Sequence, residues 1–167
     1  MSTIFPGWDK FTKRIIVNAD INKVYRAWTS KTGIESWFLR ESVFSRNGND
    51  LLPEEQVKKE DTYKWLWHGY GDDVAEYGKI LDANEKDMLQ FTFTGNCIVT
   101  VKIYKEDNET IAELTQENIP EDNDPKTNLY VGCGEGWTFY LANLKSVLEG
   151  GLDLRNRNVD RKHVINS

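Results

Sequence analysis

The chain has 167 residues, which is long enough for one domain with a substantial core. Apolar residues make up 39% and charged residues 29%, and no run approaches the roughly 20 apolar residues of a membrane-spanning helix, so we expect a soluble protein without a membrane span. Twenty-seven acidic against 21 basic residues give a formal net charge of -6, which argues against nucleic acid as the main partner, because phosphate binding relies on Lys and Arg.

The N-terminal part of the chain predicts one strand followed by two short helices. The run "FTKRIIVN" (residues 11–18) alternates apolar and polar side chains, which is typical of a half-exposed strand. Asp20 is placed as an N-cap before "INKVYRAWTS", whose apolar residues recur at helical spacing. In "TGIESWF", Thr32 and Glu35 match the T-x-x-E capping box, which predicts that a second helix begins there.

From Glu41 onward the sequence predicts antiparallel strands. "ESVFSR" is a short strand, and "NGND" after it is a turn signal. Further strands are predicted at Glu60–His68, Ala75–Leu81, Met88–Thr94, Cys97–Lys105 and Thr110–Glu117. Short polar turns join these strands, and they favour an antiparallel meander because parallel neighbours need long crossovers.

The last strand is followed by a loop and a long helix. We interpret "NIPEDNDPKTN" as a solvated acidic loop rather than a calcium site, because it lacks the glycine and the terminal Glu of an EF-hand loop. In "GEGWTFYLANLKSVLEGG" (residues 134–151) the apolar residues recur at helical spacing, and Gly150 is a fitting terminator.

These elements predict an α+β fold. A meandering sheet needs a cover for its apolar face, and an amphipathic helix needs a surface on which to bury its apolar stripe. Both needs are met if a curved antiparallel sheet of about six to seven strands wraps round the long C-terminal helix, with the two short helices following the first strand.

Three segments then point to a family. They are "ADINKVYRAWT" (residues 19–29), "GIESWF" (residues 33–38) and "GWTFYLANLK" (residues 136–145). With their order along the chain, they resemble the START-like helix-grip superfamily. Within it, the chain is similar to the family named for the C-terminal domain of the activator of heat-shock-protein-90 ATPase. None of the three segments carries a catalytic motif.

The resemblance implies a START-like domain over residues 1–152, followed by a polar, basic tail over residues 153–167. It also implies a deep cavity between the sheet and the long helix, in which members of the superfamily bind lipids, sterols, polyketides or other apolar molecules. We therefore expect non-enzymatic binding of an apolar or aromatic small molecule, without a cofactor, by a monomer or homodimer.

Two alternatives remain open at this point. One is interaction with the chaperone heat-shock-protein-90 or activation of its ATPase in a stress response, although the chain begins almost directly with its first strand and so is not expected to carry the chaperone-gripping N-terminal domain of the eukaryotic activator. The other is an enzyme of the cyclase or hydrolase type that uses an acid or base in the cavity.

The segment "YKWLWHGYG" (residues 63–71) supplies the first candidates for the cavity wall. Its Tyr63, Trp65 and Trp67 stand at alternate positions, so in a strand they share one face. Such rings could simply fill a densely packed core, but many Trp and Tyr side chains with polar atoms suit a ring-lined cleft. The full set of candidate ligand-binding residues is Trp28, Trp37, Phe38, Tyr63, Trp65, Trp67, Phe91, Phe93, Glu113, Trp137, Tyr140 and Leu141.

Glu113 is the candidate acid or base of the enzyme alternative, because desolvation raises the pKa of a carboxylate in a cavity. Glu113 and Gln116 point to opposite faces of their strand, so at most one of them lines the cavity. His68 alternates away from the three rings and is interpreted as an exposed histidine beside a turn. Two histidines and two isolated cysteines predict no zinc site.

The remaining features concern location and the C-terminus. Cys97 and Cys133 match no metal-ligand spacing and are expected to be free thiols. The N-terminus lacks the pattern of a secretory signal, so we expect a cytoplasmic location. The basic run "RNRNVDRKH" (residues 155–163) is expected to be a solvated, frayed tail.

Overall fold

The computed structural model describes residues 7–166, so the first six residues of the expected domain and the last residue of the expected tail lie outside the described part. Its strands are β1 (Phe11–Ile16), β2 (Glu41–Arg46), β3 (Asn49–Asp50), β4 (Thr62–Leu66), β5 (Ala75–Ala83), β6 (Met88–Phe93), β7 (Cys97–Glu106) and β8 (Glu109–Glu117). They form one sheet in the order β1-β8-β7-β6-β5-β4-β2-β3, and the neighbouring strands pair antiparallel.

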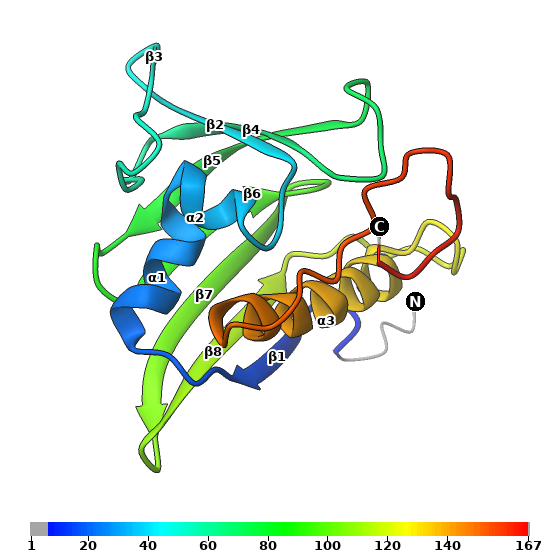
Figure 1. Ribbon diagram of the computed structural model, residues 1–167. Coiled ribbons are helices and arrows are strands. Elements are labelled where there is room, and N and C mark those ends of the chain that lie inside the picture. The colour runs from blue at the N-terminus through cyan, green and yellow to red at the C-terminus, as the bar shows by residue number, and fades with distance from the viewer. Residues whose placement is uncertain (1–6, 167) are drawn as a thin grey trace.

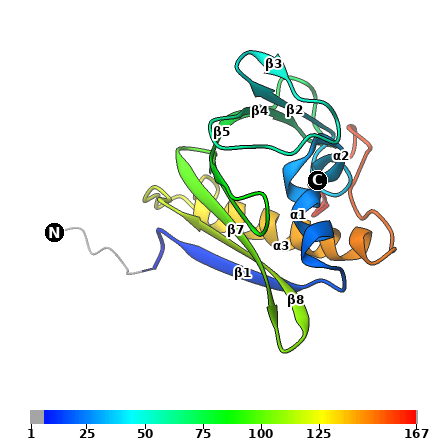
Figure 2. The ribbon, with the colours of Figure 1, turned by 90° about the vertical axis from the view of Figure 1, so that its left-hand side faces the viewer.

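Three helices occupy the inner side of this sheet: α1 (Ile21–Thr29), α2 (Lys31–Glu35) and α3 (Leu129–Leu148). In Figures 1 and 2 the long helix α3 lies across one face of the sheet, and α1 and α2 lie near one end of it. This arrangement confirms the expected α+β helix-grip fold. The sheet has eight strands rather than six or seven because the chain after the Asn47–Gly48 turn adds the two-residue strand β3.

The sheet is curved, and β5 is where its two halves meet. The register between β5 and β6 shifts between Ile80 and Asp82, and such an irregularity bends a strand. Side chains alternate along the strands as the sequence predicts: in β8, Leu114 and Gln116 are buried, whereas Thr115 between them is only half-buried. The core therefore sits between the concave face and the three helices.

The helix starts are only partly those the sequence predicts. Asp20 does cap α1, because its carboxylate accepts a hydrogen bond from the Lys23 backbone N–H at 2.7 Å. The predicted capping box is wrong: Ser30, not Thr32, caps α2, and its hydroxyl accepts from the Gly33 N–H at 3.0 Å. The chain turns directly from α1 into α2, so Ser30 both ends the first helix and starts the second.

The long helix α3 begins five residues earlier than the predicted Gly134, at Leu129. Asn128 provides the cap, because its side-chain oxygen accepts a hydrogen bond from the Val131 N–H at 3.2 Å. Gly132 lies in the part of the helix that the sequence did not predict, and glycine is a poor helix former. The helix forms there nevertheless, because Leu129 and its neighbours pack against the core.

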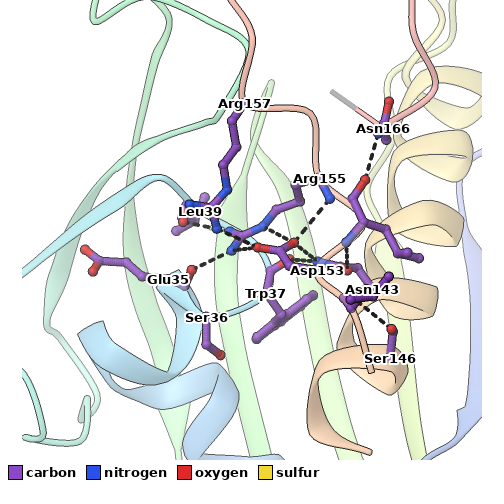
Figure 3. Close-up of polar contacts among 12 residues, drawn as sticks. Glu35, Ser36, Trp37, Leu39, Asn143, Ser146, Asp153, Arg155, Arg157 and Asn166 are labelled. Atoms are coloured by element: carbon purple, nitrogen blue, oxygen red, sulfur yellow. Dashed lines mark hydrogen bonds and ion pairs between the residues drawn. The ribbon is translucent and has the colours of Figure 1, made fainter. Parts of the chain in front are cut away.

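The C-terminal segment differs from the expected solvated, frayed tail at Arg155, although residues 157–163 are exposed. The side chain of Arg155 is buried, and its guanidinium donates to the carbonyl oxygens of Leu39 and Glu35, each at 2.9 Å. It also forms an ion pair with Asp153 at 2.8 Å (Figure 3). The sequence gave no sign of this difference, because Arg155 and Arg157 belong to the same short basic run. Only the structure shows that Arg155 is buried and Arg157 is exposed.

Asn143 on α3 completes this junction. Its side chain is fully buried, and its amide donates to the Trp37 carbonyl oxygen at 2.7 Å and to Asp153 at 3.1 Å (Figure 3). Its side-chain oxygen accepts from the Leu154 N–H at 2.8 Å. The loop after α2, the end of α3 and the C-terminal segment are thereby held together.

Candidate functional site

A cavity of about 450 Å³ lies between α3 and the β5–β6 side of the sheet. Its volume falls within the range of roughly 300–1,000 Å³ that is usual for small-molecule sites. The cavity is lined by Phe38, Trp67, Tyr70, Val74, Ala75, Glu76, Phe93, Thr94, Leu129, Gly132, Cys133, Gly136, Trp137 and Tyr140. Tyr70 and Val74 are exposed, so the loop that carries them borders its mouth.

Two glycines of α3 leave this space open. Gly132 and Gly136 are four residues apart, so they share one face of the helix, and both line the cavity. A Cβ atom at either position would meet no heavy atom within 4 Å. The sequence signal that could have identified this wall is the G-x-x-x-G spacing in an otherwise aromatic helical stripe, and our sequence reasoning missed it.

Part of the candidate ligand-binding set lines the cavity, and part does not. The aromatic residues on its wall are Phe38, Trp67, Phe93, Trp137 and Tyr140. The candidates buried in the hydrophobic core, away from the cavity, are Trp28, Trp37, Tyr63, Trp65, Phe91 and Leu141. The rings that pack directly on the sheet and on α1 and α2 are covered by other rings, so they belong to the core and do not reach the cavity.

The three alternate rings of "YKWLWHGYG" thus belong to two environments. Tyr63 and Trp65 stack with their ring centroids 3.7 Å apart, and both are almost fully buried. Gly78, which pairs with Tyr63 on β5, makes room for this stack, because a Cβ atom there would overlap the Tyr63 ring. Trp67 follows the last residue of β4, Leu66, and is only partly buried. It lines the cavity instead of the core.

Glu113 lies outside the cavity. Its carboxylate accepts a hydrogen bond from the Tyr104 hydroxyl at 2.9 Å and lies 3.8 Å from Arg14, on the outer face of the sheet. Gln116 is the inward-facing member of the pair: it is fully buried, and its side-chain oxygen accepts from the Trp137 indole N–H at 2.8 Å. Glu113, the candidate acid or base of the enzyme alternative, is therefore not in the cavity.

The polar atoms on the cavity wall are few. The Glu76 carboxylate accepts from the Thr94 backbone N–H at 2.6 Å and from the Thr94 hydroxyl at 3.2 Å. The Tyr140 hydroxyl has no hydrogen-bond partner among residues 7–166, and burial raises the pKa of Tyr140 well above its ordinary value. Burial also raises the pKa of the Cys133 thiol, which makes that thiol a weak nucleophile at neutral pH.

His68 is half-buried rather than exposed and does not line the cavity. Its pKa is lowered, first by burial and then by the nearby charges of Arg155 and Arg157. Within the described part of the chain, no group of three or more His, Cys, Asp or Glu side chains is placed to hold a metal ion. No helix within residues 7–166 combines the length and the apolar character needed to span a membrane.

A second hollow, of about 480 Å³, lies between Trp8, Asp9 and the loop of residues 119–128. Its Asp122 carboxylate already accepts hydrogen bonds from the Thr127 hydroxyl at 2.6 Å and the Asp124 N–H at 2.8 Å. The polar groups there stabilise the loop itself. The aromatic cavity, which lies between α3 and the inner face of the sheet, is the better candidate site.

Comparison with known proteins places the fold. A family model described as Activator of Hsp90 ATPase homolog 1-like protein matches residues 18–149. A protein from Staphylococcus saprophyticus is similar in structure, with a TM-score of 0.68, 18% identity, and coverage of 88% of this chain and 96% of that one. The Aha1 dimer from Colwellia psychrerythraea gives a TM-score of 0.63 and 19% identity, over 85% of this chain and 97% of that one.

DynU16, a protein of the dynemicin biosynthetic locus, is also similar, with a TM-score of 0.67 and 16% identity over 90% of this chain and 50% of that one. No curated protein matches the chain significantly in sequence. At these identities the solved structures support the fold and carry no function across.

Proposed function

This chain belongs to the family of Activator of Hsp90 ATPase homolog 1-like proteins, and from that premise we propose that it binds an apolar or aromatic small molecule in the cavity between α3 and the sheet. The observation that carries the proposal is the pair Gly132 and Gly136. Protein interiors are normally filled to crystal-like density. Here Gly132 is exposed and Gly136 is half-buried, and neither has a side chain to fill the space that they line together with the rings, which leaves a hollow of ligand size.

Binding rather than turnover is the function that these side chains support. Catalysis by a nucleophile needs a base within hydrogen-bond reach of it. The Cys133 thiol has its pKa raised by burial, and the Glu76 carboxylate is engaged by Thr94 rather than by a histidine. Glu113 faces the other side of the sheet. The wall therefore offers shape, rings and a few polar atoms.

The test fills the cavity without weakening the fold. Gly136→Leu puts a large side chain into the open space, and it should also favour the helix by about 1 kcal/mol because Leu is a far better helix former than Gly. Gly134→Ala is the matched control, since Gly134 lies on the same helix but does not line the cavity. Both substitutions raise the helix propensity of α3, but only Gly136→Leu fills the cavity.

Two measurements should follow these variants: titration with the neutral fluorescent probe N-phenyl-1-naphthylamine, and native mass spectrometry of gently purified protein. We expect wild type and Gly134→Ala to bind the probe, or to carry a discrete adduct that is lost on denaturation. Gly136→Leu should do neither while melting no lower than wild type. Equal probe binding by all three proteins, or none by any of them, would contradict the proposal.

The family name supports a second candidate function, stimulation of an Hsp90-type ATPase. It is tested by adding the protein to the Hsp90 of its own organism and measuring the ATPase rate. A stimulation that Gly136→Leu leaves unchanged would assign the effect to a surface other than the cavity. An unchanged ATPase rate with wild type would reject this candidate and would leave the binding proposal intact.

We also propose a cytoplasmic location. Both cysteines are free thiols: Cys97 is buried and Cys133 lines the cavity. Unpaired thiols suit the reducing interior of a cell. Either a monomer or a homodimer is compatible with the cavity, because residues of a single chain form its wall.

A further inference from the structure

The geometry points to a ligand that carries a positive charge, namely an alkylated ammonium group attached to an apolar or aromatic body. This inference rests on the proposed binding function and names the chemical class of the ligand. It comes from two independent features of the wall: a group of aromatic rings that contact one another, and one carboxylate with no basic partner among residues 7–166.

Five rings on the wall of the space contact one another in series. Phe38 lies at the centre, with its ring centroid 4.8 Å from that of Tyr140 and 5.1 Å from that of Trp137. The Trp137 ring in turn lies 5.3 Å from Phe93, and Trp67 lies 5.8 Å from Phe38. The faces of aromatic rings are electron-rich, and a cage of such rings attracts quaternary ammonium groups.

The carboxylate is that of Glu76 on β5, on the sheet side of the cavity. It is half-buried, and Thr94 fixes it with two hydrogen bonds from neutral donors. Within residues 7–166 it takes part in no ion pair, and the cavity wall contains no Lys, Arg or His. A carboxylate can accept about four hydrogen bonds, so Glu76 retains capacity for a cationic partner that the protein does not supply.

The charge of Glu76 acts toward the interior. After burial, which is the largest cause, this carboxylate is the next contributor to the raised pKa of Tyr63. The same negative charge also raises the pKa values of Cys97 and Cys133, again after burial. Glu76 is half-buried and has no counter-ion among residues 7–166, so a cation bound beside it would be attracted by its negative charge.

Two arginines lie close to residues of the cavity wall, and each forms its ion pair with an aspartate rather than with Glu76. Arg40 pairs with Asp72 at 2.6 Å. Arg155 pairs with Asp153 at 2.8 Å, and its remaining hydrogen bonds go to backbone carbonyl oxygens. Among the described residues that line the wall, Glu76 is the charged side chain, so an anionic ligand would meet a negative charge there and no basic side chain.

A matched pair of probes separates charge from shape. Benzyltrimethylammonium and neopentylbenzene have the same heavy-atom skeleton, but the first carries a quaternary nitrogen where the second carries a carbon. Both are small enough for a cavity of about 450 Å³. Because Trp67 and Trp137 line the cavity, binding of either probe can be followed by the change in tryptophan emission when water leaves the wall.

We expect wild type to bind the cation about tenfold or more tightly than its neutral isostere, the range that cation–π contacts and one carboxylate can supply. Glu76→Gln keeps the size and an acceptor for Thr94 but removes the charge, so it should lower cation affinity about tenfold and leave the isostere within about threefold. Glu76→Asp is the control that retains the charge, and it should retain the preference for the cation.

The outcomes distinguish this inference from the proposed function. Equal affinities of wild type for the two probes, or an unchanged cation preference in Glu76→Gln, would overturn the assignment of a cationic ligand while leaving a working cavity. Failure of both probes and of N-phenyl-1-naphthylamine to bind wild type would overturn the binding function itself. Because the probe pair is compared on wild type first, the result does not depend on the stability of any variant.

Discussion

Replacing Trp65 with Ala should reduce the stability of the protein far more than replacing Trp67 with Ala, although both tryptophans belong to the same run of alternate rings. The sequence favoured Trp65 as a ligand contact. In the structure its side chain is 1% exposed, and it packs against Tyr63, Phe38 and Phe91. Its removal leaves a hole inside the core rather than a wider cavity.

The magnitude follows from burial. A buried Trp removes roughly 150–250 Å² from water, worth about 4–6 kcal/mol at about 25 cal/mol per Å². The indole N–H of Trp65 has no hydrogen-bond partner among the described residues. Its loss relieves about 1–3 kcal/mol of desolvation cost. We therefore expect Trp65→Ala to lower the free energy of unfolding by about 3 kcal/mol, within the range known for large-to-small core changes.

Urea unfolding followed by far-ultraviolet circular dichroism measures this difference without depending on tryptophan emission. Trp65→Ala should lower the urea midpoint with little change in slope, whereas Trp67→Ala, at the cavity wall, should cost about 1 kcal/mol. Trp65→Phe keeps a ring and removes the unpaired N–H, so it should stay within about 1 kcal/mol of wild type. The reasoning is refuted if Trp65→Ala is as stable as wild type while Trp67→Ala carries the large loss.

Two further predictions concern stability. Gly78→Ala should cost about 1–3 kcal/mol by urea unfolding, because its methyl group would overlap the Tyr63 ring, whose hydroxyl is held by the Thr92 carbonyl oxygen at 2.5 Å; a variant as stable as wild type would show that the ring can move. Asp153→Asn should cost about 3 kcal/mol at pH 7 by leaving the buried Arg155 without its carboxylate. Burial alone would raise the pKa of Asp153, but hydrogen bonds from Arg155 and Arg157 outweigh it and hold that pKa well below the ordinary value. This stabilisation is therefore present above about pH 4, the unfolded pKa, and is lost as pH falls below it, so the gap between wild type and Asp153→Asn should narrow from pH 4 downward; a gap independent of pH would contradict the assignment.

The strands were predictable because their evidence is local. Alternation of apolar and polar residues, interrupted by short polar turns, is read directly from the sequence, and it located the strands from Glu41 to Glu117 to within a few residues. Asp20 as a helix cap is likewise a property of neighbouring residues. The curvature of the sheet, by contrast, depends on the register shift in β5, for which no residue pattern gave a signal.

The cavity was harder to predict because it depends on which layer covers each ring. Tyr63, Trp65 and Trp67 share a face by alternation, and only the end of β4 at Leu66 separates the last of them from the core. Glu113 and Gln116 could be recognised as opposite in direction, but the sequence could not say which faced inward. Arg155 gave no warning of its burial, because its partners are backbone carbonyl oxygens more than a hundred residues earlier in the chain.

The contacts of Arg155 also determine which parts of the cavity wall can move. It fastens the loop that carries Phe38 to the segment that leaves α3, the helix that carries Tyr140. The parts of the wall that carry Phe38 and Tyr140 are therefore expected to move together. On the other side, the loop with exposed Tyr70 and Val74 has no hydrogen bond or ion pair to α3 within residues 7–166, and the ion pair between Arg40 and Asp72 joins it to the loop after α2. We expect a ligand to enter under that loop, so that movement of the loop sets the rate of binding. The contacts of Arg155 keep the shape of the wall formed by Phe38 and Tyr140.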